Sequence, residues 1–477
     1  MLLRHTLYYL LSRGVPGVVS FLAIAVYTRL LEPGQFGLYS LMLTLVGLCD
    51  VVFYQWLRMV LGRNYPAHRA HPEDFLAGIG SLFLLTTALV GAALLVLASV
   101  YEHMLLRQFA VVVFVMLVAQ AAFDLVLTLT RAMLNPILHG ILLGSKAVLA
   151  LAAGSLLAVS GIGAEAPILG LTFGYALAII IFGRQLLPGL RPGKISKANV
   201  SAYLRYGIPL AASFALSWVI SGSDRVIITW LIDETATGLY ASGYDLGFQI
   251  LTLALVVVNT AAYPLVVSAL EREGADAARQ QLQQSGEALL SVALAGSACL
   301  ITLGSPLIEV VLSPQYRESA KSIFPLVVIS AALAGVKSYY FDIAFQLARA
   351  THYQVVSVGV AATVNIILNF ILIPHFAIQG AAWATLLAYA SALVISMLTG
   401  RRQSSLMPAL SRLLKRSVPV AMISAAACWI MQNSAPDSIT FSLVLGLIGG
   451  ALGYVLGAFA FNTFGIKTAL IKWAVRR

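Results

Sequence analysis

Apolar residues occur along this chain in long runs, separated by short polar or charged stretches. Leu, Val, Ala and Ile fill most positions of each run, without two-residue alternation. Runs of roughly 20 such residues are long enough to cross a hydrocarbon core of about 30 Å as α-helices. Breaks at Gly, Pro and charged residues predict about fourteen spans: 8–30, 38–61, 75–100, 106–128, 138–160, 164–186, 203–231, 238–267, 285–305, 322–346, 353–373, 378–399, 417–433 and 439–462.

The composition supports a membrane protein. The 477 residues are 60% hydrophobic and 10% charged, whereas soluble globular chains are typically about 25% charged. Backbone groups in lipid must be hydrogen-bonded within their own segment, and continuous apolar runs indicate helices rather than the alternating strands of a β-barrel. The predicted fold class is therefore an all-α membrane protein.

Basic residues are unevenly divided between the predicted loops. If the N-terminus is cytoplasmic, only Arg29, Arg107, Arg317 and Lys321 lie in outside loops, while most of the 30 Lys and Arg residues lie in inside loops. Because cytoplasmic loops of membrane proteins carry an excess of Lys and Arg, this asymmetry predicts that both termini are cytoplasmic. The net charge of +11 is thus a topology signal, and we expect no nucleic-acid partner.

A basic linker and an internal repeat divide the chain. The linker, residues 187–202, follows the sixth span and contains Pro188 and Pro192. Leu30-Leu31-Glu32 followed by Gly37-Leu38-Tyr39 matches Leu231-Ile232-Asp233 followed by Gly238-Leu239-Tyr240, with the same spacing. Six spans separate the copies, which indicates a parallel repeat. We predict two pseudo-symmetric six-helix bundles, 1–190 and 191–400, followed by two additional helices and a cytoplasmic tail in 401–477.

Three segments resemble motifs of one transporter family. They are Asn365 and Asn369 with Leu372-Ile373-Pro374 and Gly380-Ala381-Ala382-Trp383-Ala384-Thr385; Tyr27-Thr28-Arg29-Leu30-Leu31 with Gly37-Leu38-Tyr39-Ser40; and Ser223-Asp224-Arg225. In these motifs, and in span order and number, the chain resembles the polysaccharide exporters, the O-antigen and capsule flippases of the multidrug/oligosaccharidyl-lipid/polysaccharide superfamily. It departs from them at Phe376-Ala377, where a Tyr-Gly turn is common.

The resemblance implies a substrate and a location. The substrate would be an oligosaccharide linked to undecaprenyl diphosphate, carried by alternating access from the cytoplasmic to the outer face of the bacterial inner membrane in O-antigen, capsule or exopolysaccharide biosynthesis. Its expected partners are this lipid-linked oligosaccharide and the membrane lipids, with a polysaccharide polymerase or ligase as a further candidate.

Ionisable residues inside the predicted spans are the candidate site residues, because each is costly in lipid and tends to face a cavity or a partner. Arg and Lys could bind a diphosphate, and buried carboxylates could couple transport to proton or sodium movement; structural pairing and snorkelling are the alternative interpretations. The substrate-binding candidates are Lys337, Arg225, Arg13, Arg58 and Lys146, and the ion-coupling candidates are Asp50, Asp124, Asp224 and Asp342.

Position within the span distinguishes these candidates. Lys337 lies roughly fifteen residues into its predicted span, near the membrane midplane and beyond easy snorkelling reach. Asp342 lies five residues further on, where an α-helix would make it a weaker partner than a residue at i+4. Arg13 and Arg58 lie closer to span ends, where a long side chain can snorkel.

No catalytic or cofactor-binding pattern is present in the sequence. H-E-x-x-H, G-x-S-x-G and phosphate-loop motifs are missing, and Cys49, Cys299 and Cys428 lie singly in apolar stretches. We expect a transporter rather than an enzyme, with no cofactor and no metal site. A cation-coupled multidrug exporter of the same superfamily is the alternative. A glycosyl polymerase or ligase is disfavoured, because such enzymes usually carry a large extracytoplasmic loop.

The predicted topology can be tested with reporter fusions. A reporter that is active only in the cytoplasm should be active when it is joined after Arg477, because the uneven distribution of bases between the loops predicts a cytoplasmic C-terminus. Alkaline phosphatase and green fluorescent protein, fused at the same position, report opposite sides of the membrane. Phosphatase activity after Arg477 would overturn the orientation.

Overall fold

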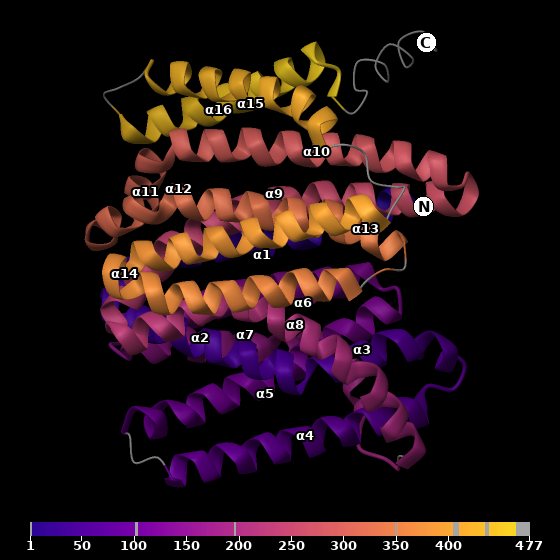
Figure 1. The fold of residues 1–477 in the computed structure, drawn as a ribbon. Helices are drawn as coiled ribbons and strands as arrows, with labels where there is room; N and C mark the ends of the chain where they lie inside the picture. Colours follow the sequence, from indigo (N-terminus) through magenta and orange to yellow (C-terminus); the bar gives the residue numbers. More distant parts are fainter. Residues whose placement is uncertain are drawn as a thin grey trace. The chain divides into compact units, whose positions relative to one another are not determined.

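Helices make up all of the regular structure that is described. The computed structural model describes residues 2–100, 104–194, 197–348, 350, 352–403, 410–434 and 438–463, with side chains except those of 2–13, 97, 98, 100, 104–109, 197, 198, 209, 210, 213, 401–403, 410 and 412. Within these ranges every element is an α-, 3₁₀- or π-helix, as Figure 1 shows. This confirms the predicted all-α fold class.

The chain divides into two compact units, residues 1–238 and 239–477. The first contains α1 (Leu2–Leu30), α2 (Pro33–Phe53), α3 (Gln55–Asn64), η1 (Tyr65–His68), α4 (Glu73–Val100), α5 (Met104–Ala132), α6 (Pro136–Val159), η2 (Gly163–Glu165), α7 (Ala166–Ala178), η3 (Ile179–Gly183), η4 (Arg184–Leu190), α8 (Lys197–Leu231) and the start of α9 (Glu234–Arg272). The predicted division at 190 and 400 rests on the sequence repeat and stays a prediction.

The second unit holds the rest of α9 and seven further α-helices. The α-helices are α10 (Ala275–Thr302), α11 (Gly304–Val311), α12 (Pro314–Val336), α13 (Asp342–Leu347), α14 (His352–Gln403), α15 (Leu410–Gln432) and α16 (Ile439–Ala460), and the π-helix η5 (Lys337–Phe341) lies between α12 and α13.

Each predicted span coincides with helix. In the described part of the chain, 11 helices are long and apolar enough to cross a membrane, and Gly14–Leu30 of α1 is a shorter apolar one. The predicted span 203–231 lies in α8, and the spans 353–373 and 378–399 are two arms of α14 that meet at a kink at Ala377. The length of the apolar runs was therefore sufficient to locate the membrane helices.

Proline and side-chain caps set several helix starts. Pro33, Pro136 and Pro314 each lie in the first turn of a helix, where the missing N–H would have had no intrahelical partner. Asn135 caps α6, because its Oδ1 accepts a hydrogen bond from the Leu138 amide at 3.0 Å.

The two glycines aligned by the sequence repeat contact each other within the first unit. A Cβ on Gly37 would collide with the Glu234 carbonyl group, and a Cβ on Gly238 would collide with that of Pro33. Only glycine allows the first turns of α2 and α9 to approach so closely. The contact is reciprocal, since each glycine lies against the carbonyl group at the start of the other helix.

In the second unit, α15 and α16 pack on each other, and α15 packs along α10 (Figure 1). Glycines at 446, 449, 450, 453 and 457 form one face of α16, and a Cβ on Gly453 would lie 2.8 Å from Cα of Ser424. Small residues allow such close helix packing in membranes. Glu287 of α10, 1% exposed, accepts hydrogen bonds from Arg416 of α15 at 3.1 and 3.2 Å.

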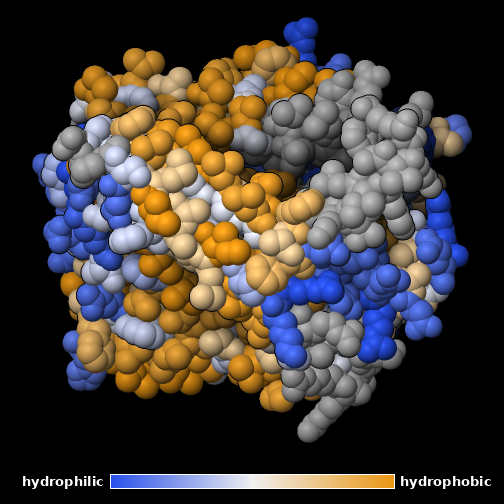
Figure 2. All heavy atoms as spheres, turned by 90° about the horizontal axis from the view of Figure 1, so that it is seen from above, coloured by the Kyte–Doolittle hydropathy of each residue, from blue (hydrophilic) through white to orange (hydrophobic). Residues whose placement is uncertain are grey.

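The surface carries many large apolar side chains. Leu95, Val159 and Trp230 are among the most exposed, at 74%, 73% and 73%. Figure 2 shows apolar residues, in orange, over much of the face drawn. Apolar patches of this extent mark surfaces that are covered by lipid or by other protein, and they agree with a membrane-spanning chain.

The kink in α14 is strained. Ala377 has φ 47° and ψ −130°, a backbone region that is essentially reserved for glycine. Ala377 also stands where the resembling family commonly has the glycine of a Tyr-Gly turn. Close packing accompanies the strain, because a Cβ on Gly380 would collide with the carbonyl group of Leu372.

We predict that Ala377→Gly stabilises the protein by about 1 kcal/mol, because the relief of backbone strain exceeds the conformational entropy that glycine loses. The melting temperature of the purified protein in detergent should rise. Ala388→Gly in the second arm of α14 is the matched control, and it should lower stability by about 1 kcal/mol or more. A lower melting temperature for Ala377→Gly would contradict the strain.

Candidate functional site

Arg58 is the centre of a buried acid–base cluster in the first unit. Its Nη1 and Nη2 donate to Oδ1 and Oδ2 of Asp50 at 2.9 and 2.7 Å, and Nη1 also donates to Oδ2 of Asp124 at 2.9 Å. Nε donates to Oε1 of Gln55 at 3.0 Å. Asp50 belongs to α2, and Arg58 to α3 beyond the helix break at Tyr54, so the guanidinium fork joins α2 and α3 to Asp124 of α5.

Burial differs within this cluster. Arg58 and Asp50 are 7% and 3% exposed, whereas the Asp124 side chain is 32% exposed. The bidentate contact with Asp50 is therefore enclosed by protein, and Asp124 is the more exposed of the two acids. A buried cation of this kind requires such partners, because an isolated charge in a medium of low dielectric constant is strongly unfavourable.

Lys146 of α6 extends the cluster. Its ammonium group interacts electrostatically with Asp124. It also lies 4.5 Å from the ring centroid of Tyr175 of α7, a cation–π contact, and the Tyr175 hydroxyl donates to Oε1 of Gln120 at 3.3 Å. The cluster thus holds two bases and two acids, and its formal charge is balanced.

Arg225 lies apart from this cluster but against the same helix. It is 8% exposed, and its Nη1 donates to Oγ1 of Thr44 of α2 at 3.4 Å. Thr44 precedes Asp50 by six residues, or about 9 Å along the helix axis. The adjacent Asp224 is 1% exposed. Arg13, the remaining candidate cation, lies outside the residues whose side chains are described.

Lys337 and Asp342 form an ion pair in the second unit, and the expectation of a weak pair was wrong. Nζ of Lys337 donates to Oδ2 of Asp342 at 2.9 Å, and both residues are 4% exposed. The expectation assumed α-helical geometry, but Lys337–Phe341 is a π-helical turn. In a π-turn the residue at i+5, not i+4, closes the turn, so Asp342 lies on the same side of the helix as Lys337.

Several features of these charge clusters were not predicted from the sequence. Gln55 and Tyr175 were not singled out, because nothing in their neighbourhood distinguishes them from other polar residues at span ends or in spans. The π-turn also has no clear sequence signal apart from the two opposite charges five residues apart. Asn365 Nδ2 donates to Oγ1 of Thr385 at 3.4 Å, which joins the two arms of α14.

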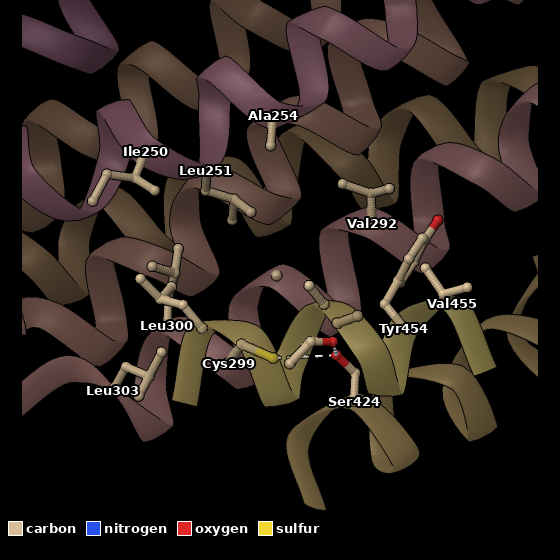
Figure 3. Close-up of a pocket in the computed structure, with 15 residues that line it drawn as sticks. Ile250, Leu251, Ala254, Val292, Cys299, Leu300, Leu303, Ser424, Tyr454 and Val455 are labelled. Carbon is tan, nitrogen blue, oxygen red and sulfur yellow. Dashed lines mark hydrogen bonds between the residues drawn. The ribbon is translucent and has the colours of Figure 1, made fainter. Parts of the chain in front are cut away.

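An apolar cavity of about 470 Å³ lies between α9, α10, α15 and α16. Figure 3 shows Leu251 and Ala254 on one side and Tyr454 and Val455 on another. Ser424 at its floor donates to the carbonyl of Gly450 at 2.7 Å, and its hydroxyl lies 3.2 Å from Sγ of Cys299. The cavity therefore suits an apolar ligand, since its few polar groups already bind one another.

Metal ligands are not grouped anywhere among the residues that could be searched. No three His, Cys, Asp or Glu side chains in the described ranges lie together as they would around an ion.

Known proteins resemble this chain in sequence and in fold. The curated "Probable flippase AglR" of Haloferax volcanii is 22% identical over 306 residues, which is 62% of each chain, so this chain spans less than two thirds of that relative. The structure titled "Lipid II flippase MurJ, inward closed conformation" has a TM-score of 0.75 at 12% identity and covers 95% of this chain and 98% of its own.

A MOP superfamily transporter from Pyrococcus furiosus gives a TM-score of 0.61 at 12% identity, with 85% of this chain and 96% of that chain covered. At such identities the likeness shows the fold alone, and the fold is that of MOP transporters. The family model described as "Polysaccharide biosynthesis protein" matches residues 26–321. Because this match includes more than half of the chain, the protein belongs to the family of polysaccharide biosynthesis proteins.

Proposed function

We propose that this protein is a flippase for an oligosaccharide linked to undecaprenyl diphosphate. It moves this substrate by alternating access from the cytoplasmic to the outer face of the bacterial inner membrane, in O-antigen, capsule or exopolysaccharide biosynthesis. The protein acts as a transporter and not as an enzyme, and both of its termini are cytoplasmic. A polysaccharide polymerase or ligase is its candidate partner.

The observation that carries this proposal is the family match over residues 26–321 in a chain with a transporter fold. Membership of a polysaccharide biosynthesis family supports the class of pathway, and a fold shared with transporters supports transport as the activity. The names of the relative and of the structural neighbour, a probable flippase and a lipid II flippase, support flippase activity, and the second name supports a lipid-linked substrate.

The paired cations suggest how an anionic headgroup could be exchanged. Arg58 and Lys337 both contact carboxylates, at 2.7 and 2.9 Å respectively. A diphosphate and a carboxylate compete for the same donors, since both accept charge-assisted hydrogen bonds. Protonation of the carboxylate would favour the diphosphate, so we propose Asp124, which is the more exposed acid, and then Asp50, Asp224 and Asp342, as the ion-coupling residues.

The lipid part of the substrate needs an apolar surface. The cavity lined by α9, α10, α15 and α16 offers one of about 470 Å³, and an isoprenoid chain gains free energy from burial of each methylene-sized group, about 0.8 kcal/mol. We propose that this cavity receives part of the undecaprenyl chain while the charged headgroup contacts Arg and Lys.

A cation-coupled multidrug exporter is the second candidate. Multidrug MATE transporters of the MOP superfamily share the fold, with a TM-score of 0.59 for an inward-facing one. That structure covers 85% of this chain, whereas the lipid II flippase covers 95% with a TM-score of 0.75. The greater coverage and the family match favour the flippase.

The membrane potential should drive export. Outward movement of a diphosphate carries negative charge toward the positive side, which is favourable by about 2.3 kcal/mol per charge per 100 mV. In vesicles that contain the purified protein and an undecaprenyl-diphosphate-linked oligosaccharide, transport should accelerate when the substrate side is made negative, without nucleotide. Vesicles with no imposed potential are the control. A rate that responds to a proton or sodium gradient but not to potential would contradict this drive, and no transport at all would contradict the function.

Arg58 should be required for export beyond its part in folding. Arg58→Met alone leaves Asp50 buried without its cation, so it should lower stability by about 3–5 kcal/mol and reduce the amount of inserted protein. The double variant Asp50→Leu/Arg58→Met removes both charges and should restore insertion. Export, measured as surface polysaccharide per inserted protein, should remain at least tenfold below wild type. Normal export by the double variant would make Arg58 purely structural.

A further inference from the structure

The Lys337–Asp342 ion pair depends on the π-helical turn between the two residues. The amide of Asp342 donates to the carbonyl of Lys337, five residues before it, which is the bond that defines a π-turn. In an uninterrupted α-helix, residues i and i+5 point about 140° apart, since successive residues are about 100° apart. Conversion of η5 to α-helix would therefore separate the ammonium group from the carboxylate.

The turn in its present form depends on the pair as well. Lys337-Ser338-Tyr339-Tyr340-Phe341-Asp342 contains neither Gly nor Pro, so no residue in it forces a departure from α-helix. Asp342 Oδ1 has no hydrogen-bond partner among the described residues, and Oδ2 binds Lys337. The charge pair is thus one interaction that stabilises the wider turn, beside the packing of the buried Tyr340 and Phe341.

We propose that this segment is a two-state latch that controls whether Lys337 can bind an anion. In the π state, seen here, Asp342 occupies the ammonium group and Lys337 is closed. In the α state, Asp342 rotates away, and the ammonium group binds an oxygen of the anionic diphosphate headgroup. This assignment rests on the proposed flippase function for the identity of the anion, but the conversion of the turn does not.

The conversion has a defined geometric consequence. A π-turn holds one residue more than the α-turn it replaces, so its loss moves every residue of α13 by one helical position, about 100° and 1.5 Å. Phe345, which is fully buried, would move to the place of Gln346, which is exposed. The latch therefore links the pairing of Lys337 to the orientation of α13.

Deletion of Ser338 tests the latch in transport. The deletion removes the extra residue, leaves α13 in its present place, and brings Lys337 and Asp342 to i, i+4 spacing, where an α-helix keeps them paired. We expect wild-type insertion but export at least tenfold lower. Ser338 is exposed, so Ser338→Ala, which keeps the π-turn, is the matched control and should export normally. Wild-type export by the deletion variant would overturn the latch.

Thiol labelling tests the conversion without substrate. Asp342→Asn removes the charge pair, so the turn should relax to α-helix. Single cysteines placed by Phe345→Cys and by Gln346→Cys would be labelled with N-ethylmaleimide in vesicles and quantified by peptide mass spectrometry. The labelling ratio of position 345 to position 346 should rise at least fivefold with Asp342→Asn.

The same ratio should not change with Asp342→Asn in chains that lack Ser338, because the deletion has already removed the extra residue of the π-turn and α13 has no reason to shift. If Asp342→Asn leaves the ratio unchanged in the chain that retains Ser338, the latch is overturned whatever the substrate is. If Asp342→Asn changes the ratio but the wild-type protein moves no lipid-linked oligosaccharide, the latch is retained and the proposed function is rejected instead. The two failures are therefore distinguishable.

Discussion

A charge inside a membrane must have a partner, and this constraint organises the interior of the protein. An unpaired Arg, Lys or Asp at the centre of the bilayer costs several kcal/mol, and the penalty is greater where protein excludes water. Arg58 is accordingly held by Asp50 and Asp124, Lys337 by Asp342, and Arg416 by Glu287. The packing of the helices brings charges of opposite sign together. The same helix contacts therefore bury apolar surface and pair the buried charges.

Pairing of this kind also limits what a transporter can bind. A cation whose donors are already taken by a carboxylate cannot also receive a diphosphate without the loss of that contact. If the substrate is the proposed diphosphate, the acids would compete with it for these donors as well as act as structural partners. Asp124 is partly exposed, whereas Asp50 is buried. Of the two carboxylate contacts of Arg58, the one with Asp124 would therefore be the first that a diphosphate replaces.

Much of the fold follows from the sequence, because the length of an apolar run is a direct physical requirement of the bilayer. The positions of α4, α6 and α16 agree with their predicted spans for this reason. Side-chain contacts between distant residues do not follow from run length. The approach of Asp124 to Arg58, 66 positions apart, depends on how α3 and α5 pack, and α-helical spacing gave the wrong result for Lys337 and Asp342. Ala377 shows the same limit, since a residue that favours α-helix occupies a kink.

Three departures from regular α-helix lie beside a buried ion pair or at a bend of a helix. The break at Tyr54 separates Asp50 from Arg58, the π-turn places Asp342 against Lys337, and the strained Ala377 divides α14. Regular helices satisfy every backbone group within lipid, so departures from them persist only where another interaction compensates. Two of these three departures are compensated by a buried ion pair. Loss of such a pair would therefore act directly on backbone geometry, and this would give the charge of the proposed headgroup a short physical route to the movement of a helix.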